Sequence, residues 1–255
     1  MTRFLLFQLY GPLASWGETA VGEIRSTATH PTKSAIMGLL SAAKGIRSAE
    51  EELLSRMSLE YGVAILEKGS NISLRDFHTA QTPMTSAEKS VGRYASRRHE
   101  LMVTHPDKNL NTVISWRDYI SDGVYHVAIW EKSSTPPFTL DNLKEALLNP
   151  TFVLYLGRRS CPLALPLTPI IQDAEDPVDA LCSVTFPKEH SVDMIGKKRR
   201  SYSIFFEGEW KSISGNPSHT EYRYDRLISR KRWQYGSRTE RRIMVSKNKE
   251  GELCI

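Results

Sequence analysis

The pattern of hydrophobic and polar positions along the chain predicts a mixture of strands and helices. Continuous apolar runs bounded by turn residues indicate buried strands, and apolar positions at helical spacing indicate helices. The predicted strands span residues 3–10, 61–67, 72–78, 124–131, 152–156 and 201–207, and the predicted helices span residues 31–44, 49–58 and 140–148. The order of the elements before residue 157 approximates βαββαβ, as in ferredoxin-like RNA-recognition domains.

Turn and capping residues set the boundaries of these elements. Gly11-Pro12 is expected to end the first strand. Thr29 or Thr32 is expected to cap the first helix, and Gly45 to stop it. Residues 68–71 (KGSN) are typical of a turn, so the second and third strands are expected to pair as a hairpin.

Two breaks in the pattern divide the chain. Residues 79–112 are polar and aperiodic, and ordered domains rarely keep so long a loop unless it is functional or disordered. Five prolines between residues 162 and 187 mark the second break. The sequence therefore predicts an α+β chain with an N-terminal domain at 1–165 and a smaller, basic, mostly β domain at 166–255.

Charge is unevenly distributed along the 255 residues, whose formal net charge is +5. Residues 1–190 carry 19 basic and 21 acidic side chains, whereas residues 191–255 carry 15 basic and 8 acidic ones. Clustered Lys and Arg favour a polyanionic partner because they displace counterions from phosphates. The alternative is a solvated basic face that binds nothing.

Several classes of protein are disfavoured by what the sequence lacks. Its three cysteines are too scattered for a disulfide framework or a CxxC site, so a reducing cytoplasm is the simplest setting. No apolar run approaches the roughly 18 residues of a membrane span. The P-loop, GxGxxG, HExxH and GxSxG patterns are all absent. We therefore expect no cofactor, no metal and no membrane partner.

Metal-independent RNA cleavage needs only a base, an acid and a cation around a 2′-hydroxyl. Tyr10 ends the first strand, Lys33 opens the first helix and His78 ends the third strand, so all three could meet at one edge of the sheet. An endoribonuclease that uses these three residues is the alternative function. The plainer interpretation is that each packs and makes one structural hydrogen bond.

Cations interleaved with aromatic residues favour binding of single-stranded RNA. In the basic tail, Lys197–Arg200 precedes Tyr202, and Arg230–Arg232 adjoins Trp233 and Tyr235. The segment 79–112 has a similar basic composition. The alternative is a basic face whose aromatic residues belong to the core.

The densest local signal is residues 155–162, YLGRRSCP. Adjacent Arg158 and Arg159 are followed by the hydroxyl of Ser160 between a glycine and a proline. Guanidinium groups bind phosphate in a planar, bidentate manner, so such a turn can hold an RNA backbone. Composition alone allows a simple turn with a salt bridge.

This segment and four others resemble the CasD family of type I-E CRISPR systems, within the RAMP superfamily. The other segments are residues 11–17 (GPLASWG), 25–40 (RSTATHPTKSAIMGLL), 74–79 (LRDFHT) and 115–119 (SWRDY). They occur in the family's order, and the resemblance covers roughly residues 3–170. It extends more loosely to the basic stretch around 230–233.

The resemblance implies a ferredoxin-like N-terminal domain with a thumb hairpin, at about residues 79–112, and a small C-terminal domain. It implies a subunit of the Cascade surveillance complex that binds the 5′ handle of the CRISPR RNA and caps the filament of backbone subunits. The neighbouring large subunit recognises the PAM, so target DNA is met only through the complex. Type I-E systems leave the cutting of CRISPR RNA to a separate subunit. Residues 192–200 also lack the glycine-rich loop that many RAMP nucleases carry. We therefore expect this protein to bind RNA without cutting it.

The resemblance also names residues for the RNA site. The predicted wall of the handle groove comprises Trp16, Arg25, Thr27, Lys33 and Ser34, and the second wall comprises Arg158, Arg159 and Ser160. The thumb matches the family poorly, and its own basic and aromatic residues predict the contacts there: Arg93, Tyr94, Arg97 and Arg98.

Overall fold

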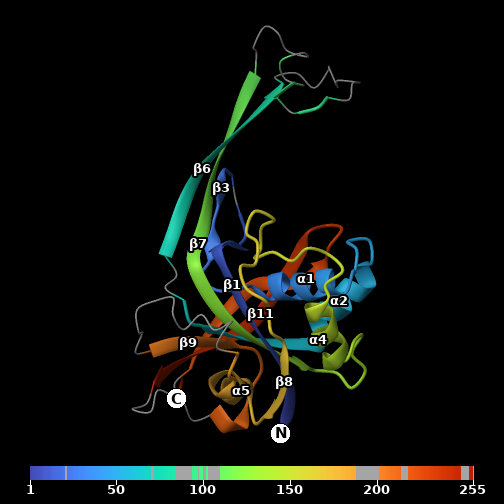
Figure 1. Ribbon diagram of the computed structural model, residues 1–255, viewed down its shortest axis with the longest axis vertical. Coiled ribbons are helices and arrows are strands. Elements are labelled where there is room, and N and C mark those ends of the chain that lie inside the picture. Colours follow the sequence, from blue (N-terminus) through green and yellow to red (C-terminus); the bar gives the residue numbers. More distant parts are fainter. Residues whose placement is uncertain are drawn as a thin grey trace.

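The chain is a mixed α+β protein built on one large, mostly antiparallel sheet with few helices (Figure 1). A computed structural model describes residues 1–20, 22–69, 72–83, 94–96, 98–99, 102, 110–187, 201–213, 218–247 and 253–254. The α+β class predicted from the sequence is confirmed.

The strands are β1 (Thr2–Ala14), β2 (Trp16–Gly17), β3 (Ile24–Arg25), β4 (Thr27–Ala28), β5 (Tyr61–Glu67), β6 (Ile72–Pro83), β7 (Leu110–Glu131), β8 (Ile170–Ala174), β9 (Ser201–Phe206), β10 (His219–Ser229), β11 (Gln234–Lys247) and β12 (Leu253–Cys254). The helices are α1 (Lys33–Ala43), α2 (Glu51–Glu60), α4 (Leu140–Leu148), α5 (Pro177–Ser183) and the short 3₁₀ helix η2 (Lys211–Ile213).

The main sheet has the order β10-β11-β9-β5-β7-β1-β8, with every neighbouring pair on this path antiparallel. Strands from both sides of residue 165 join it, because β8 pairs with β1 and β9 pairs with β5. The sheet is therefore continuous across the predicted domain boundary, and the division into 1–165 and 166–255 stays a prediction.

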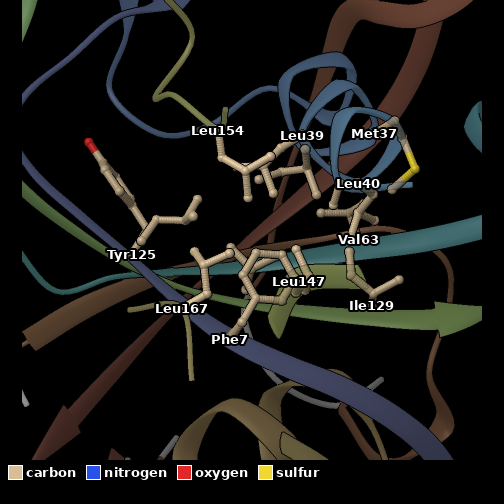
Figure 2. Close-up of a cluster of buried hydrophobic side chains, with 14 of the residues drawn as sticks. Phe7, Met37, Leu39, Leu40, Val63, Tyr125, Ile129, Leu147, Leu154 and Leu167 are labelled. Carbon is tan, nitrogen blue, oxygen red and sulfur yellow. The ribbon is translucent and has the colours of Figure 1, made fainter. Parts of the chain in front are cut away.

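The core lies on both faces of the sheet. Along β1, Leu5, Phe7 and Leu9 face the cluster formed with α1 and α4 (Figure 2), whereas Phe4 and Leu6 face the cluster formed with α5. All five side chains are fully buried. This double burial explains why β1 is a continuous apolar run, since a strand covered on both faces needs no polar alternation.

Local signals placed several elements correctly. The predicted strand at 61–67 and helix at 140–148 have the observed bounds. The side chain of Thr32 accepts a hydrogen bond from Ala35 N and caps α1, and Gly45 follows the helix with φ 77°. The first strand is longer than predicted, because Gly11 and Leu13 continue the ladder with β7 on either side of Pro12.

The predicted hairpin of residues 61–67 with 72–78 is wrong. Strands β5 and β6 both pair with β7, β5 along residues 125–131 and β6 along residues 110–121. Strand β7 is 22 residues long, and its first half forms with β6 a two-stranded ribbon that projects from the body (Figure 1).

The predicted strand at 152–156 is also wrong. Tyr155 makes one isolated bridge, to Pro162. The amides of Thr151 and Phe152 instead donate to the carbonyl oxygens of Ala43 and Ala42 at the end of α1, at 3.0 and 3.2 Å. These bonds divert the segment from the sheet and lay it beside α1.

Candidate nucleic-acid interface

A groove of 1070 Å³ lies beside α1, between residues 152–157 and the hairpin of β10 and β11. The helix lines it with small side chains, including Ser34, Ala35 and Gly38. Small residues allow a ligand to approach the helix surface closely. Ser34, one of the predicted RNA contacts, therefore lies in the groove.

Exposed aromatic side chains line the groove and can stack on a ligand. Tyr155, Tyr224 and Trp233 line it and are 39%, 69% and 67% exposed, so their rings are available to a ligand. The guanidinium of Arg230 lies 3.8 Å from the ring centroid of Trp233. Rings and cations arranged in this way suit unstacked bases and phosphates.

The turn with the paired arginines follows directly from the groove. Gly157, which lines the groove, has φ 82°, and a Cβ there would lie 1.8 Å from the carbonyl oxygen of Ser15, so only glycine fits. The next residue, Arg158, lies over the ring of Tyr119 at 4.9 Å and donates to the carbonyl oxygen of Arg25 at 3.2 Å.

Two members of the predicted second wall make contacts within the protein: Arg158 as described above, and Ser160, whose hydroxyl lies 4.0 Å from Cys161 Sγ. Arg158 Nη1 is buried and has no hydrogen-bond partner among the described residues. Arg159 and Ser160 are exposed at the turn. The turn therefore offers donors to an anion without first having to break an ion pair with a carboxylate of the described chain.

Two members of the predicted first wall mainly hold the local backbone. Arg25 is exposed, and its Nη1 donates to the carbonyl oxygen of Gly22 at 2.6 Å. The hydroxyl of Thr27 accepts from the amide of Trp16 at 2.8 Å and donates to the carbonyl oxygen of Ala28. The structure brings together Arg25 and Arg158, which were assigned to different walls, through the hydrogen bond from Arg158 to the Arg25 carbonyl oxygen.

The side chains of Trp16 and Lys33 do not face the groove as predicted. Trp16 is 1% exposed and packs edge-on against Tyr125. Lys33 is 2% exposed, and its Nζ donates to the carbonyl oxygen of Tyr61 at 2.8 Å and to Glu207 at 2.9 Å. The side chain of Trp16 packs in the core, and that of Lys33 is held by hydrogen bonds and an ion pair, so neither lines the groove.

Lys33 belongs to a buried ion network that joins α1 to the β9–β11 part of the sheet. Its backbone amide donates to Asp225 Oδ2 at 2.7 Å. Arg238 binds both oxygens of Asp225, at 2.6 and 2.9 Å, and donates to Glu240 at 2.6 Å. It also lies 3.5 Å from Glu207.

The electrostatics of this network favour the ionised forms of Arg238 and Glu240 despite burial, but not that of Lys33. Burial alone would lower the pKa of Arg238, but the carboxylates of Asp225, Glu240 and Glu207 outweigh it and raise the pKa. Burial would raise the pKa of Glu240, but the hydrogen bond from His30 and the charge of Arg238 bring it to about 2. For Lys33, burial outweighs the attraction of Glu207, so its pKa is lowered.

Sequence reasoning missed this network and part of the groove. Lys33 and Asp225 are 192 positions apart, and no local pattern signals such a contact. Tyr224 carries no distinguishing pattern either. By contrast, Trp233 and Tyr235 had been marked by the interleaving of cations with aromatics.

The candidate catalytic trio is not assembled. Tyr10 pairs with Val124 and His78 with Ser115, nine residues further along β7, which corresponds to about 30 Å of strand. Lys33 is buried against Tyr61, whose own partner lies at the far end of β7. The three side chains therefore cannot act on one phosphodiester in this arrangement.

Of the predicted thumb contacts, Arg93 and Arg97 lie outside the described residues. Tyr94 is half-buried, with its ring edge-on to His99 at 5.8 Å, and Arg98 is exposed.

Within the described ranges, no group of three His, Cys, Asp or Glu side chains could hold a metal ion. No described helix is long and apolar enough to cross a membrane.

A family model described as "CRISPR-associated protein (Cas_Cas5)" matches residues 4–241, which is most of the chain. The chain belongs to this family of CRISPR-associated proteins. Among its relatives is "CRISPR system Cascade subunit CasD" of Escherichia coli (strain K12), which is 33% identical over 191 residues, 71% of this chain and 76% of that protein. The predicted resemblance to the CasD family is thereby confirmed.

Solved structures share the fold of this Cas5-family protein. A chain of a "CRISPR RNA-guided surveillance complex" superposes with a TM-score of 0.61 at 24% identity, over 94% of this chain and 89% of that chain. A "Crystal structure of Cas protein" gives a TM-score of 0.57 at 21% identity, over 96% and 95%. At these identities the likeness concerns the fold alone.

Proposed function

We propose that this chain is a subunit of a Cascade-type surveillance complex, in the cytoplasm, that binds the 5′ handle of the CRISPR RNA without cleaving it. The observation that carries the proposal is the groove, in which exposed aromatic rings adjoin the Arg158–Ser160 turn. Single-stranded RNA is bound by this combination, since its phosphates take the charge and its unstacked bases take the rings. Membership of the family and the identity to CasD support the same function.

The topology supports a ferredoxin-like assignment for the N-terminal part of the chain. In sequence, β1, α1, β5, β7, α4 and β8 follow the order βαββαβ. In space, their strands have the antiparallel order β5-β7-β1-β8, so β1 lies between the third and fourth strands of the motif.

The ribbon of β6 and β7 is proposed to be the family's thumb. A two-stranded ribbon is only marginally stable in water by itself. Here Phe77 and Trp116 pair across the strands with ring centroids 4.9 Å apart and remain 51% and 40% exposed. Exposed apolar side chains of this size on a projecting element favour burial against a partner. The proposed partners are the backbone filament and the large subunit.

Handle binding can be tested by removing the paired arginines. In a filter-binding titration with labelled repeat RNA, Arg158→Ala with Arg159→Ala is expected to weaken binding and to lower the salt slope by about 0.7 for each lost phosphate contact. The matched control is Arg3→Ala with Lys144→Ala, which removes two cations from β1 and α4, outside both the groove lining and the Arg158–Ser160 turn. An equal salt slope for both double variants would contradict the proposal.

The absence of cleavage is tested separately. The separation of Tyr10, Lys33 and His78 along the sheet supports a non-catalytic role. Pure protein incubated with labelled repeat RNA in EDTA is expected to leave the RNA intact. A discrete product that disappears in His78→Ala would overturn this part of the proposal and favour the metal-independent endoribonuclease.

A further inference from the structure

The solvent-facing side of β10 carries an aromatic and basic surface that the handle groove does not account for. Tyr222, Tyr224, Arg226 and Ile228 are all exposed, the two tyrosines to 75% and 69%, and Arg226 and Ile228 lie beyond a register shift that follows Arg223. We call these four residues the β10 platform. The opposite side of the strand faces the ion network through Asp225.

The platform is an uncovered part of a sheet face that is covered elsewhere. Tyr222 pairs with Thr239 of β11, and further along the same side of β11 lie Ile243 and Val245, both buried in the cluster with α5. An open antiparallel sheet face with exposed aromatics is the surface on which RNA-recognition domains stack bases. The end of the sheet at β10 offers such a face.

The charge of the platform complements a polyanion. The guanidinium of Arg226 lies over its cross-strand partner Gly236, where an added Cβ would come within 3.0 Å of Nη2. Within the described part of the chain, no carboxylate pairs with Arg226. The nearby Arg241 pairs with Glu209, which is 84% exposed, so Arg226 is the cation of this surface that is left for a phosphate.

The platform and the groove share Tyr224, which lines the groove as well as standing on the outer side of β10. A register shift between Arg223 and Arg226 interrupts the ladder at this point. Such an irregularity bends the strand and re-aims its side chains, which accounts for Tyr224 reaching both surfaces. A strand held in the groove can therefore continue onto the platform without leaving the protein.

We propose that the β10 platform binds single-stranded RNA as a continuation of the handle path, with bases stacked on Tyr222 and Tyr224 and a phosphate on Arg226. The proposal rests on the proposed handle-binding function. Stacking requires the ring and not the hydroxyl, and it is tolerant of base identity. The platform is accordingly expected to add affinity without adding sequence preference.

The test compares variants of the full chain in anisotropy titrations with labelled repeat RNA. Tyr222→Ala, at a residue that does not line the groove, is expected to weaken binding roughly 5- to 150-fold through the loss of one stacked base. Tyr222→Phe keeps the ring and is expected to bind within about twofold of the wild type. Arg226→Gln is expected to lower the salt slope by about 0.7.

The outcomes separate this proposal from the handle assignment. If Tyr222→Ala binds RNA like the wild type while Arg158→Ala with Arg159→Ala binds weakly, the platform proposal is overturned and the handle site stands. If Tyr222→Ala binds weakly and the arginine pair does not, the handle site fails, and the platform binds RNA but not as a continuation of the handle path. RNA affinity unchanged in Tyr222→Ala, with loss of assembly into the complex, would assign the platform to a protein partner and overturn the proposal.

Discussion

Replacing Arg238 with methionine isolates the energetic role of the buried ion network. The guanidinium is 8% exposed and contacts Asp225, Glu240 and Glu207, all of them also nearly buried. Methionine fills most of the volume but leaves three carboxylates that face only Lys33, His30 and the more peripheral cations. Removing one partner of a buried pair costs about 3–5 kcal/mol, and a typical domain has a stability of only about 5–15 kcal/mol.

The cost is expected to be much smaller when the carboxylate is neutralised as well. Asp225→Asn retains an oxygen that can accept the hydrogen bond from the Lys33 amide and removes one uncompensated charge. The double variant is therefore expected to be less destabilised than the sum of the single variants, by more than about 1.5 kcal/mol. The assay is urea unfolding at about pH 7, followed by circular dichroism.

The matched control is Arg241→Met, three residues further along the same strand. Arg241 pairs with Glu209 at the surface, where ion pairs contribute about 0–1 kcal/mol. If Arg238→Met lost no more stability than this control, or if the Arg238 and Asp225 substitutions were additive, the network would not hold β10 and β11 against α1 and the reasoning would be refuted.

Three further predictions concern pH and the backbone. The pKa of Glu240 is lowered from 4.5 to about 2, so its contribution to stability is present above pH 4.5 and is lost as the pH falls from 4.5 toward 2. In Glu240→Gln, the unfolding free energy should therefore fall less steeply with pH over that range, as measured by acid unfolding. Burial raises the pKa of Tyr61 to about 12, so its contribution is present below pH 10 and is lost between pH 10 and 12; Tyr61→Phe should show a weaker dependence of unfolding free energy on pH there. Gly157→Ala must adopt a φ of 82° and displace the carbonyl of Ser15, so it should cost more than about 2 kcal/mol in urea unfolding and weaken RNA binding, and wild-type values for both would contradict the assigned backbone constraint.

The sequence predicted the elements that are determined by interactions among neighbouring residues, and not those that depend on contacts between distant parts of the chain. Strand β5 and helix α4 are complete patterns within seven and nine residues, and their bounds were predicted correctly. The pairing of β6 was not, because its partner residues lie on the other side of the polar segment 84–109 and a KGSN turn signals a local hairpin equally well. Periodicity describes one strand at a time and carries no information on which strand lies beside it.

The same limit applies to the site. The resemblance and the residue pattern marked the Arg158–Ser160 turn and Ser34, which lie at or in the groove. They could not distinguish Lys33, buried in ion pairs, from a solvent-facing cation, because burial is set by Glu207 and Asp225, more than 170 positions away. The identity of a basic residue is visible in the sequence, whereas its exposure is decided by the fold.

The hairpin of β10 and β11 shows why the net charge of the tail is a poor guide to its RNA contacts. Asp225 and Arg238 face inward, where they form an ion pair, whereas Tyr222 and Arg226 of the same hairpin are exposed. One cation and three carboxylates of residues 191–255 therefore lie inside the protein, namely Arg238 with Asp225, Glu207 and Glu240, so the net charge of the segment does not measure the charge that it exposes. The inward charges fix the hairpin beside α1 and so shape the groove, while the outward ones remain for a polyanion. Side chains on the two sides of the hairpin therefore have different roles. Those on the inner side support the interface, and those on the outer side can contact RNA.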